Sequence, residues 1–123
     1  MQKKEIAISF LRMASAGQVR PAYDKFVAPG FIHHNQYFKG DRQSLLLAME
    51  EASKKNPNKA IEIKHVYEAG DTIITHSHVI RQDPVLPGIA VVHIFRFEGD
   101  QIAELWDVGQ MMELMSPNEN GLF

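Results

Sequence analysis

The sequence predicts a single α+β domain in which N-terminal helices pack against a curved antiparallel sheet. In the first half of the 123 residues apolar side chains recur at helical spacing, and after Pro57 they alternate with polar ones, which is typical of half-buried strands. The predicted strands are separated by turn-forming residues, so we expect a meander that wraps the helices. A chain of this length has room for one hydrophobic core, and the domain is expected to cover residues 1–123.

The predicted helices cover residues 3–16, 19–27 and 41–56. Gly17 follows the first helix where a helix is expected to stop, and Pro21 occupies a tolerated position in the first turn of the second. Asp41 can cap the third helix, which Pro57 ends. Each helix carries an apolar stripe, which we expect it to bury against the sheet.

The predicted strands cover residues 61–68, 72–81, 89–98 and 102–108. Turn-forming pairs at 70–71 and 99–100 provide tight turns, and a proline-containing loop at 82–88 connects the two middle strands. Residues 109–123 contain further turn-forming residues and are expected to form an irregular C-terminal tail.

The outer face of such a sheet needs a cover. Ile94 and Trp106 would otherwise add to an exposed apolar patch on that face. We therefore expect a homodimer that forms through the outer face of the sheet.

Charge and composition exclude several partners and sites. The net charge is −2, from 13 basic and 15 acidic residues spread along the chain, so neither nucleic acid nor a membrane surface is an expected partner. No apolar stretch is long enough to span a membrane. The absence of cysteine removes disulfides, thiolate metal sites and cysteine nucleophiles, and it favours a cytoplasmic location. No nucleotide-binding loop or serine-hydrolase motif is present, and no cofactor is expected.

Four of the six histidines fall in predicted strands, where a polar ring on an apolar face needs a hydrogen-bond partner or a ligand. A two-residue turn at 70–71 pairs His65 with His76 and Ile63 with His78, so the three imidazoles are expected to line one cavity. His76 and His78 could also bind zinc or iron, with His65 or Asp107 as a further ligand. Because such spacing is often accidental, no metal is predicted.

The register of the last hairpin decides whether His93 and Asp107 meet. With a two-residue loop, His93 opposes Trp106 and lies on the face opposite Asp107. With a three-residue loop, which can include a bulge, His93 and Asp107 share a face. The second register also leaves Arg96 and Glu104 together on the other face, where their charges can pair, and we predict this register.

Asp107 is the candidate acid/base group. A carboxylate in an apolar cavity has its pKa raised by desolvation and lowered by a nearby imidazolium, and proton transfer requires such tunability. Asp107 could instead cap its strand or pair with a histidine. His93 and the loop residue His34 are its candidate catalytic partners. The side chains expected to contact a substrate are Tyr23, Asn35, His65, His76, His78, Phe95 and Leu105.

Four segments carry a family resemblance: FIHHN at 31–35, HSH at 76–78, VHIFRF at 92–97 and ELWDVGQ at 104–110. In this order and spacing, over nearly its whole length, the chain resembles the SnoaL-like polyketide cyclases of the nuclear-transport-factor-two-like superfamily. The resemblance implies a cone-shaped, cystatin-like α+β barrel with an internal pocket, which dimerises through the outer sheet face.

The same resemblance implies an aldol cyclisation without metal or organic cofactor. Asp107 matches the acid/base aspartate of the family, and His93 matches its nearby histidine. Many relatives have a histidine where this chain has Leu105, so an apolar group replaces a further pocket imidazole.

Three functions remain open. The first is a cofactor-independent lyase or isomerase in which Asp107 removes a proton alpha to a carbonyl while His93 or His34 stabilises the enolate oxygen. The second is a module of the same fold that binds a small hydrophobic molecule without chemistry. The third is a metal protein that uses the His76 and His78 pair.

Overall fold

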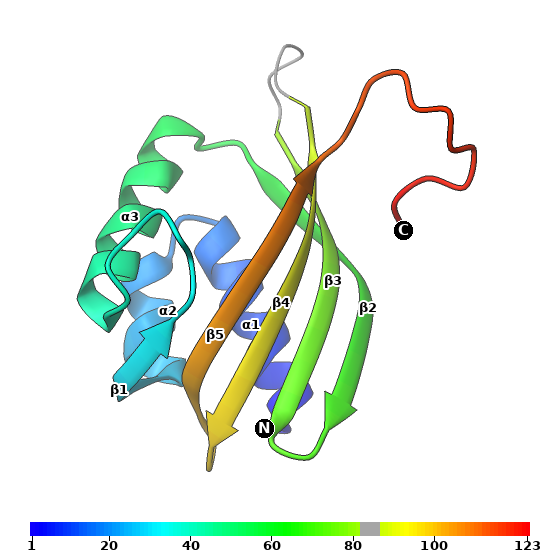
Figure 1. Cartoon of the computed structure of the whole chain (residues 1–123). Coiled ribbons are helices and arrows are strands. Elements are labelled where there is room, and N and C mark those ends of the chain that lie inside the picture. The colour runs from blue at the N-terminus through cyan, green and yellow to red at the C-terminus, as the bar shows by residue number, and fades with distance from the viewer. Residues whose placement is uncertain (82–86) are drawn as a thin grey trace.

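The protein folds as three helices and a five-stranded sheet in the computed structural model, which describes residues 1–81 and 87–123 (Figure 1). The elements in chain order are α1 (Lys3–Ser15), α2 (Val19–Phe26), β1 (Val27–His33), α3 (Arg42–Lys55), β2 (Ala60–Ala69), β3 (Thr72–Ile80), β4 (Ile89–Glu98) and β5 (Gln101–Met111). The strand order is β1-β5-β4-β3-β2; β1 is parallel to β5, and the other neighbours are antiparallel. The predicted α+β class is confirmed.

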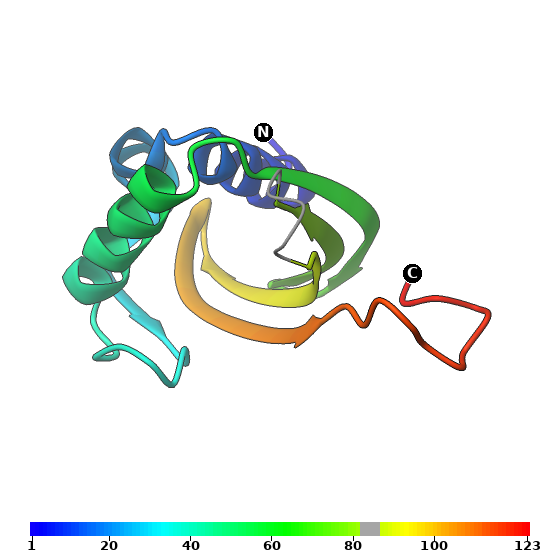
Figure 2. The same ribbon diagram turned by 90° about the horizontal axis from the view of Figure 1, so that it is seen from above.

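The sheet is strongly curved and wraps around α1, as the view from above shows (Figure 2). It does not close into a barrel, because β1 and β2 are its two edges. The core fills the concave side, where the ring of Phe10 in α1 lies 5.5 Å from that of Tyr23 in α2 and 6.1 Å from that of Phe95 in β4. The concave face and the helices therefore enclose the space in which a site can form.

The helices lie where their sequence signals place them. The Asp41 carboxylate accepts a hydrogen bond from the Ser44 backbone N–H at 3.0 Å and so caps α3. Gly17 follows α1 with a φ of 87°, which favours glycine. The buried stripe of α1 consists of Ile6, Ala7, Phe10, Leu11 and Ala14. This stripe packs against the concave face of the sheet.

Strand β1 is absent from the sequence prediction, which ended the second helix at Val27 and treated the following residues as loop. Val27 instead pairs with Ile102, and His33 pairs with Leu105. The two paired stretches of β1 are out of step, with a register shift between Val27 and Ile32, so no regular alternation marks the strand. This strand carries the chain to the loop that holds Asn35.

The first hairpin contains a bulge that changes the predicted faces. His65 opposes His76 as expected, but the register shifts between Ile63 and His65, so Ile63 opposes Ser77 rather than His78. The extra residue, Lys64, turns Val66 toward the core. The three strand histidines consequently lie on the outer face, and their predicted place in the cavity is wrong.

The last hairpin has the predicted register. His93 opposes Asp107, and Arg96 opposes Glu104 with a hydrogen bond of 2.9 Å from Nε to the carboxylate. The predicted three-residue loop is wrong, because Glu98 pairs with Gln101 and the connection is a two-residue turn. The parity changes instead through a bulge at Ala103, beside the Arg96–Phe97 step. The bulge, rather than a longer loop, places His93 and Asp107 on one face.

The C-terminal tail begins later than predicted. Gly109 opposes Val91 and Met111 opposes Ile89, so β5 continues through the first three residues of the predicted tail. Residues 112–123 contain no helix or strand, and the Phe123 ring at their end packs 5.0 Å from the ring of His78 on the outer face.

Within the described residues, none of the helices has the length and apolar character needed to cross a membrane.

The two faces of the sheet should differ in their contribution to stability. Phe95 on the concave face is fully buried, whereas Tyr67 on the outer face is 57% exposed. We expect Phe95→Ala to lower the free energy of unfolding by about 3–5 kcal/mol, because it leaves a cavity in the core. The control Tyr67→Ala should cost less than about 1 kcal/mol in the same chemical denaturation experiment. Equal losses would contradict the assignment of faces.

Candidate functional site

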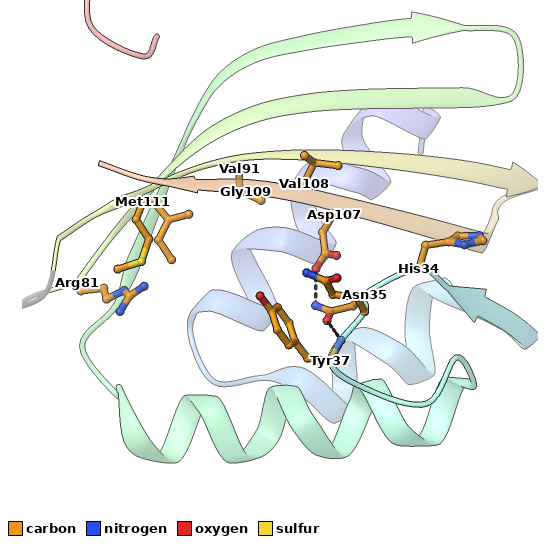
Figure 3. A pocket seen from close by; sticks show the side chains of 11 residues that line it. His34, Asn35, Tyr37, Arg81, Val91, Asp107, Val108, Gly109 and Met111 are labelled. Atoms are coloured by element: carbon orange, nitrogen blue, oxygen red, sulfur yellow. Dashed lines mark hydrogen bonds between the residues drawn. The ribbon is translucent and has the colours of Figure 1, made fainter. Parts of the chain in front are cut away.

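Two adjoining spaces lie on the concave side of the sheet. One, of about 290 Å³, is lined mainly by apolar side chains of α1 and α3 and is called the inner cavity here. The other, of about 640 Å³, is called the vestibule and includes Tyr37, Arg81 and Met111 in its wall (Figure 3). Asn35 and Asp107 line both spaces. The sequence-predicted aspartate therefore stands where the two spaces meet.

Asp107 is held by the loop that follows β1. The Asn35 side-chain N–H donates to Asp107 Oδ2 at 3.0 Å, while Asn35 Oδ1 accepts from the Tyr37 backbone N–H at 3.0 Å (Figure 3). The Asn35 amide is thus fixed at both ends. The other carboxylate oxygen, Oδ1, has no hydrogen bond to any residue that the structure describes, which leaves it available to accept a proton.

His33 positions the same loop. Its Nδ1 accepts a hydrogen bond from the Asn35 backbone N–H at 3.0 Å, so its Nε2 carries the proton and donates to the Lys39 carbonyl at 2.6 Å. His33 is buried, and its ring stacks on Phe31 with 6.4 Å between the ring centroids. The sequence analysis assigned no role to His33. Its partners are backbone groups, and a sequence pattern does not show which backbone groups a side chain will contact.

His93 lies opposite Asp107 and lines the inner cavity. Burial lowers the pKa of its imidazole to about 4, although the Asp107 carboxylate acts in the opposite direction. The ring is therefore uncharged at neutral pH. Its Nδ1 is buried and has no hydrogen-bond partner among the described residues. An uncharged imidazole with an unused ring nitrogen can exchange a hydrogen bond with a ligand in the cavity.

Two buried hydroxyls continue this polar row. Thr75 opposes His93 across β3 and β4, and Ser77 follows two residues later on the same face. Both side chains are fully buried, and neither hydroxyl finds a partner within residues 1–81 and 87–123. Sequence reasoning missed them because they alternate with His76 and His78, which drew attention to the other face. Beside His93, the concave face thus carries buried polar groups without partners among the described residues, which is unusual in a protein core.

His34 is not brought to Asp107. Its Nε2 lies 2.6 Å from Glu104 Oε2, and its ring stacks on Trp106 with 4.7 Å between the ring centroids. Hydrogen bonds from His34 and Arg96 lower the pKa of Glu104. The ring of His34 points away from Asp107 at the edge of the vestibule (Figure 3). Its interactions are those of a group that fastens β1 to β5.

The histidines of the first hairpin are grouped, but on the outer face. The His65 and His76 rings stack with 5.4 Å between their centroids, and Phe123 packs 5.3 Å from His76. Among the described residues, no three histidine, aspartate or glutamate side chains lie close enough together to hold a metal ion. His65, His76 and His78 do not line the inner cavity, because they project from the outer face of β2 and β3.

The remaining predicted contacts surround the cavity at different depths. Leu105 lines the inner cavity, whereas Phe95 and Tyr23 are fully buried behind its wall. The Tyr23 hydroxyl donates to Met49 Sδ at 3.1 Å, and burial raises its pKa. Sequence reasoning missed Lys59, which lines the cavity from the connection between α3 and β2 and carries no recognisable pattern.

His93 should make stability depend on pH. Between pH 6.5 and about 4 the unfolded chain binds a proton at this ring that the folded chain excludes, so the free energy of unfolding falls as the pH falls through this window. For this group the loss reaches about 3 kcal/mol. Denaturant titrations at several pH values should show a shallower decline for His93→Gln than for the unmodified protein. The control His78→Gln, on the outer face, should keep the original slope.

Comparisons with known proteins support the architecture. No protein-family model and no curated protein matches the chain. Among solved structures, an uncharacterised cystatin-fold protein from Novosphingobium aromaticivorans is 20% identical with a TM-score of 0.75, and the match covers 88% of this chain and 98% of that one.

Two further structures are similar. An NTF2-like protein of unknown function from Cytophaga hutchinsonii is 14% identical, with a TM-score of 0.71 and coverage of 89% and 91%. A candidate polyketide cyclase from Acidithiobacillus ferrooxidans is 19% identical, with a TM-score of 0.72 and coverage of 87% of each chain. At these identities the likeness establishes the fold alone. The chain has the nuclear-transport-factor-two-like, or cystatin-like, fold.

Proposed function

We propose that the protein is a cofactor-independent enzyme that removes a proton alpha to a carbonyl group of a small, largely apolar molecule, with Asp107 as the base. One observation carries the proposal: a carboxylate with one unused oxygen faces a mostly apolar cavity opposite an uncharged imidazole. A base and a hydrogen-bond donor on one wall are the two groups that enolisation needs.

In the proposed reaction, Asp107 accepts the alpha proton while the electron pair of the C–H bond moves into the carbonyl and forms an enolate. The N–H of neutral His93 donates a hydrogen bond to the enolate oxygen, where negative charge develops. Asn35 keeps the carboxylate in place through Oδ2. The mainly apolar lining of the cavity lowers the local dielectric constant and so strengthens both interactions.

The enolate then has two outcomes. Return of the proton from Asp107 to a different carbon gives an isomerisation. Attack of the enolate carbon on a second carbonyl of the same molecule gives an aldol cyclisation, in which the new alkoxide takes the proton from Asp107. The fold similarity to a candidate polyketide cyclase supports the second outcome.

A binding module without chemistry is the second candidate. It is favoured by the hydrogen bond that Asp107 already makes to Asn35, since such a bond also serves a purely structural role. Under this alternative, Asp107→Asn keeps the affinity for an apolar ligand, and no variant of the cavity changes the rate of any reaction.

The outer face supports the homodimer expected from the sequence. Ile94 and Trp106 oppose each other there, and the neighbouring Val108 is exposed. A second copy of the chain on this face would remove these apolar groups from water.

Proton abstraction can be tested without knowledge of the natural substrate. Exchange of the alpha protons of 2-tetralone and benzoylacetone in D₂O can be followed by NMR with and without protein. We expect the protein to accelerate exchange, and Asp107→Asn to lower the protein-dependent rate at least about a thousandfold, because the base is lost. His93→Gln should lower it about a hundredfold. The control His78→Gln should leave it unchanged, and undiminished exchange with Asp107→Asn would exclude the proposed base.

The dimer can be tested by light scattering after gel filtration. We expect the mass of two chains, and Ile94→Asp should give the mass of one, because it places a charge in the interface. Leu47→Asp, at an exposed apolar position of α3, is the matched control and should remain dimeric. A single-chain mass for the unmodified protein would rule out the dimer.

A further inference from the structure

Lys59 lines the inner cavity together with His93 and Asp107. It is half-buried and directly precedes β2, in the connection that leads from α3 to this edge strand of the sheet. The same side chain also lines a smaller space of about 120 Å³, whose wall includes Ile61, Val79 and again His93. Lys59 is thus a cationic side chain in the wall of a mainly apolar enclosure, which also contains His93 and Asp107.

No ion pair within the described residues involves Lys59. Asp107 lines the same cavity but is not paired with it. Burial and the positive charge of Arg81 both lower the pKa of Lys59. A half-buried ammonium group beside another cation is costly unless an anion meets it, so the enclosure favours a negatively charged group at this point.

We infer that Lys59 binds a carboxylate of the substrate, so that the molecule taken up is a small apolar carboxylic acid that also carries the reacting carbonyl. This inference rests on the proposed function only for the role of the carbonyl. The ammonium group of Lys59 anchors the anionic end, and the apolar body lies against side chains such as Leu11 and Met49. The carbonyl end then faces His93 and Asp107.

The charge arrangement determines the orientation of such a molecule. A carboxylate is attracted by Lys59 and repelled by Asp107. Asp107 also lines the vestibule, which Lys59 does not, and Lys59 also lines the smaller space, which Asp107 does not. Only one of the two end-to-end orientations satisfies both interactions. A neutral analogue of the same shape lacks this preference and leaves the ammonium group unpaired.

The inference is tested with 4-phenylbutanoate and its neutral amide, 4-phenylbutanamide, as competitors of the fluorescent probe N-phenyl-1-naphthylamine. For the unmodified protein we expect the carboxylate to bind about tenfold or more tightly than the amide, because charge-assisted hydrogen bonds contribute on this scale. Lys59→Gln should abolish the difference, and Lys59→Arg, which keeps the charge, should retain most of it. Lys64→Gln, which changes an exposed lysine on β2, is the matched control and should retain all of it.

Equal affinities for the two competitors, or failure of the carboxylate to displace the probe, would overturn the inference. So would a preference that survives Lys59→Gln or is lost in Lys59→Arg, provided that thermal melting shows both variants folded. Asp107→Asn separates this inference from the proposed function. It should keep or increase the preference for the carboxylate while it abolishes proton exchange, so either idea can fail alone.

Discussion

The pairing of β4 with β5 is the constraint on which both the core and the candidate site depend. Alternation along β4 sends Phe95 into the core and His93 to the cavity wall, and the register sets Leu105 and Asp107 beside them. The core allows no other register of β5 on β4, since a shift by one residue would bury Glu104 in place of Leu105. The polar pair is therefore positioned by the hydrophobic effect acting on its neighbours.

The candidate site combines a rigid part with a part supplied by a loop. His93 and Asp107 stand on adjacent strands, where backbone pairing defines their separation, whereas Asn35 arrives from the connection after β1. His33 holds this connection through two hydrogen bonds to backbone groups. Preorganisation of this kind suits the proposed role of Asp107, because the carboxylate does not have to be ordered at the moment of reaction.

The fold and the central pair of the site could be predicted from the sequence because they depend on alternation. The charges of Arg96 and Glu104 were sufficient to choose the register of the last hairpin, and the structure confirms that choice. The bulge at Lys64 could not be predicted, since the residues around it fit either parity until the core is assembled. The hydrogen bond from Asn35 and the position of Lys59 depend on contacts between distant segments, which local patterns do not encode.

The bulge at Ala103 restricts the insertions and deletions that this hairpin can accept during evolution. A deletion there would turn every later residue of β5 to the opposite face, so that Trp106 would enter the core while the carboxylate moved outside. The deletion would therefore remove the candidate site and lower the stability of the fold at the same time. Proteins with this fold should therefore evolve more easily by substitution of side chains than by a change in the length of β5. New ligand specificities should arise in the helices and loops that face the sheet.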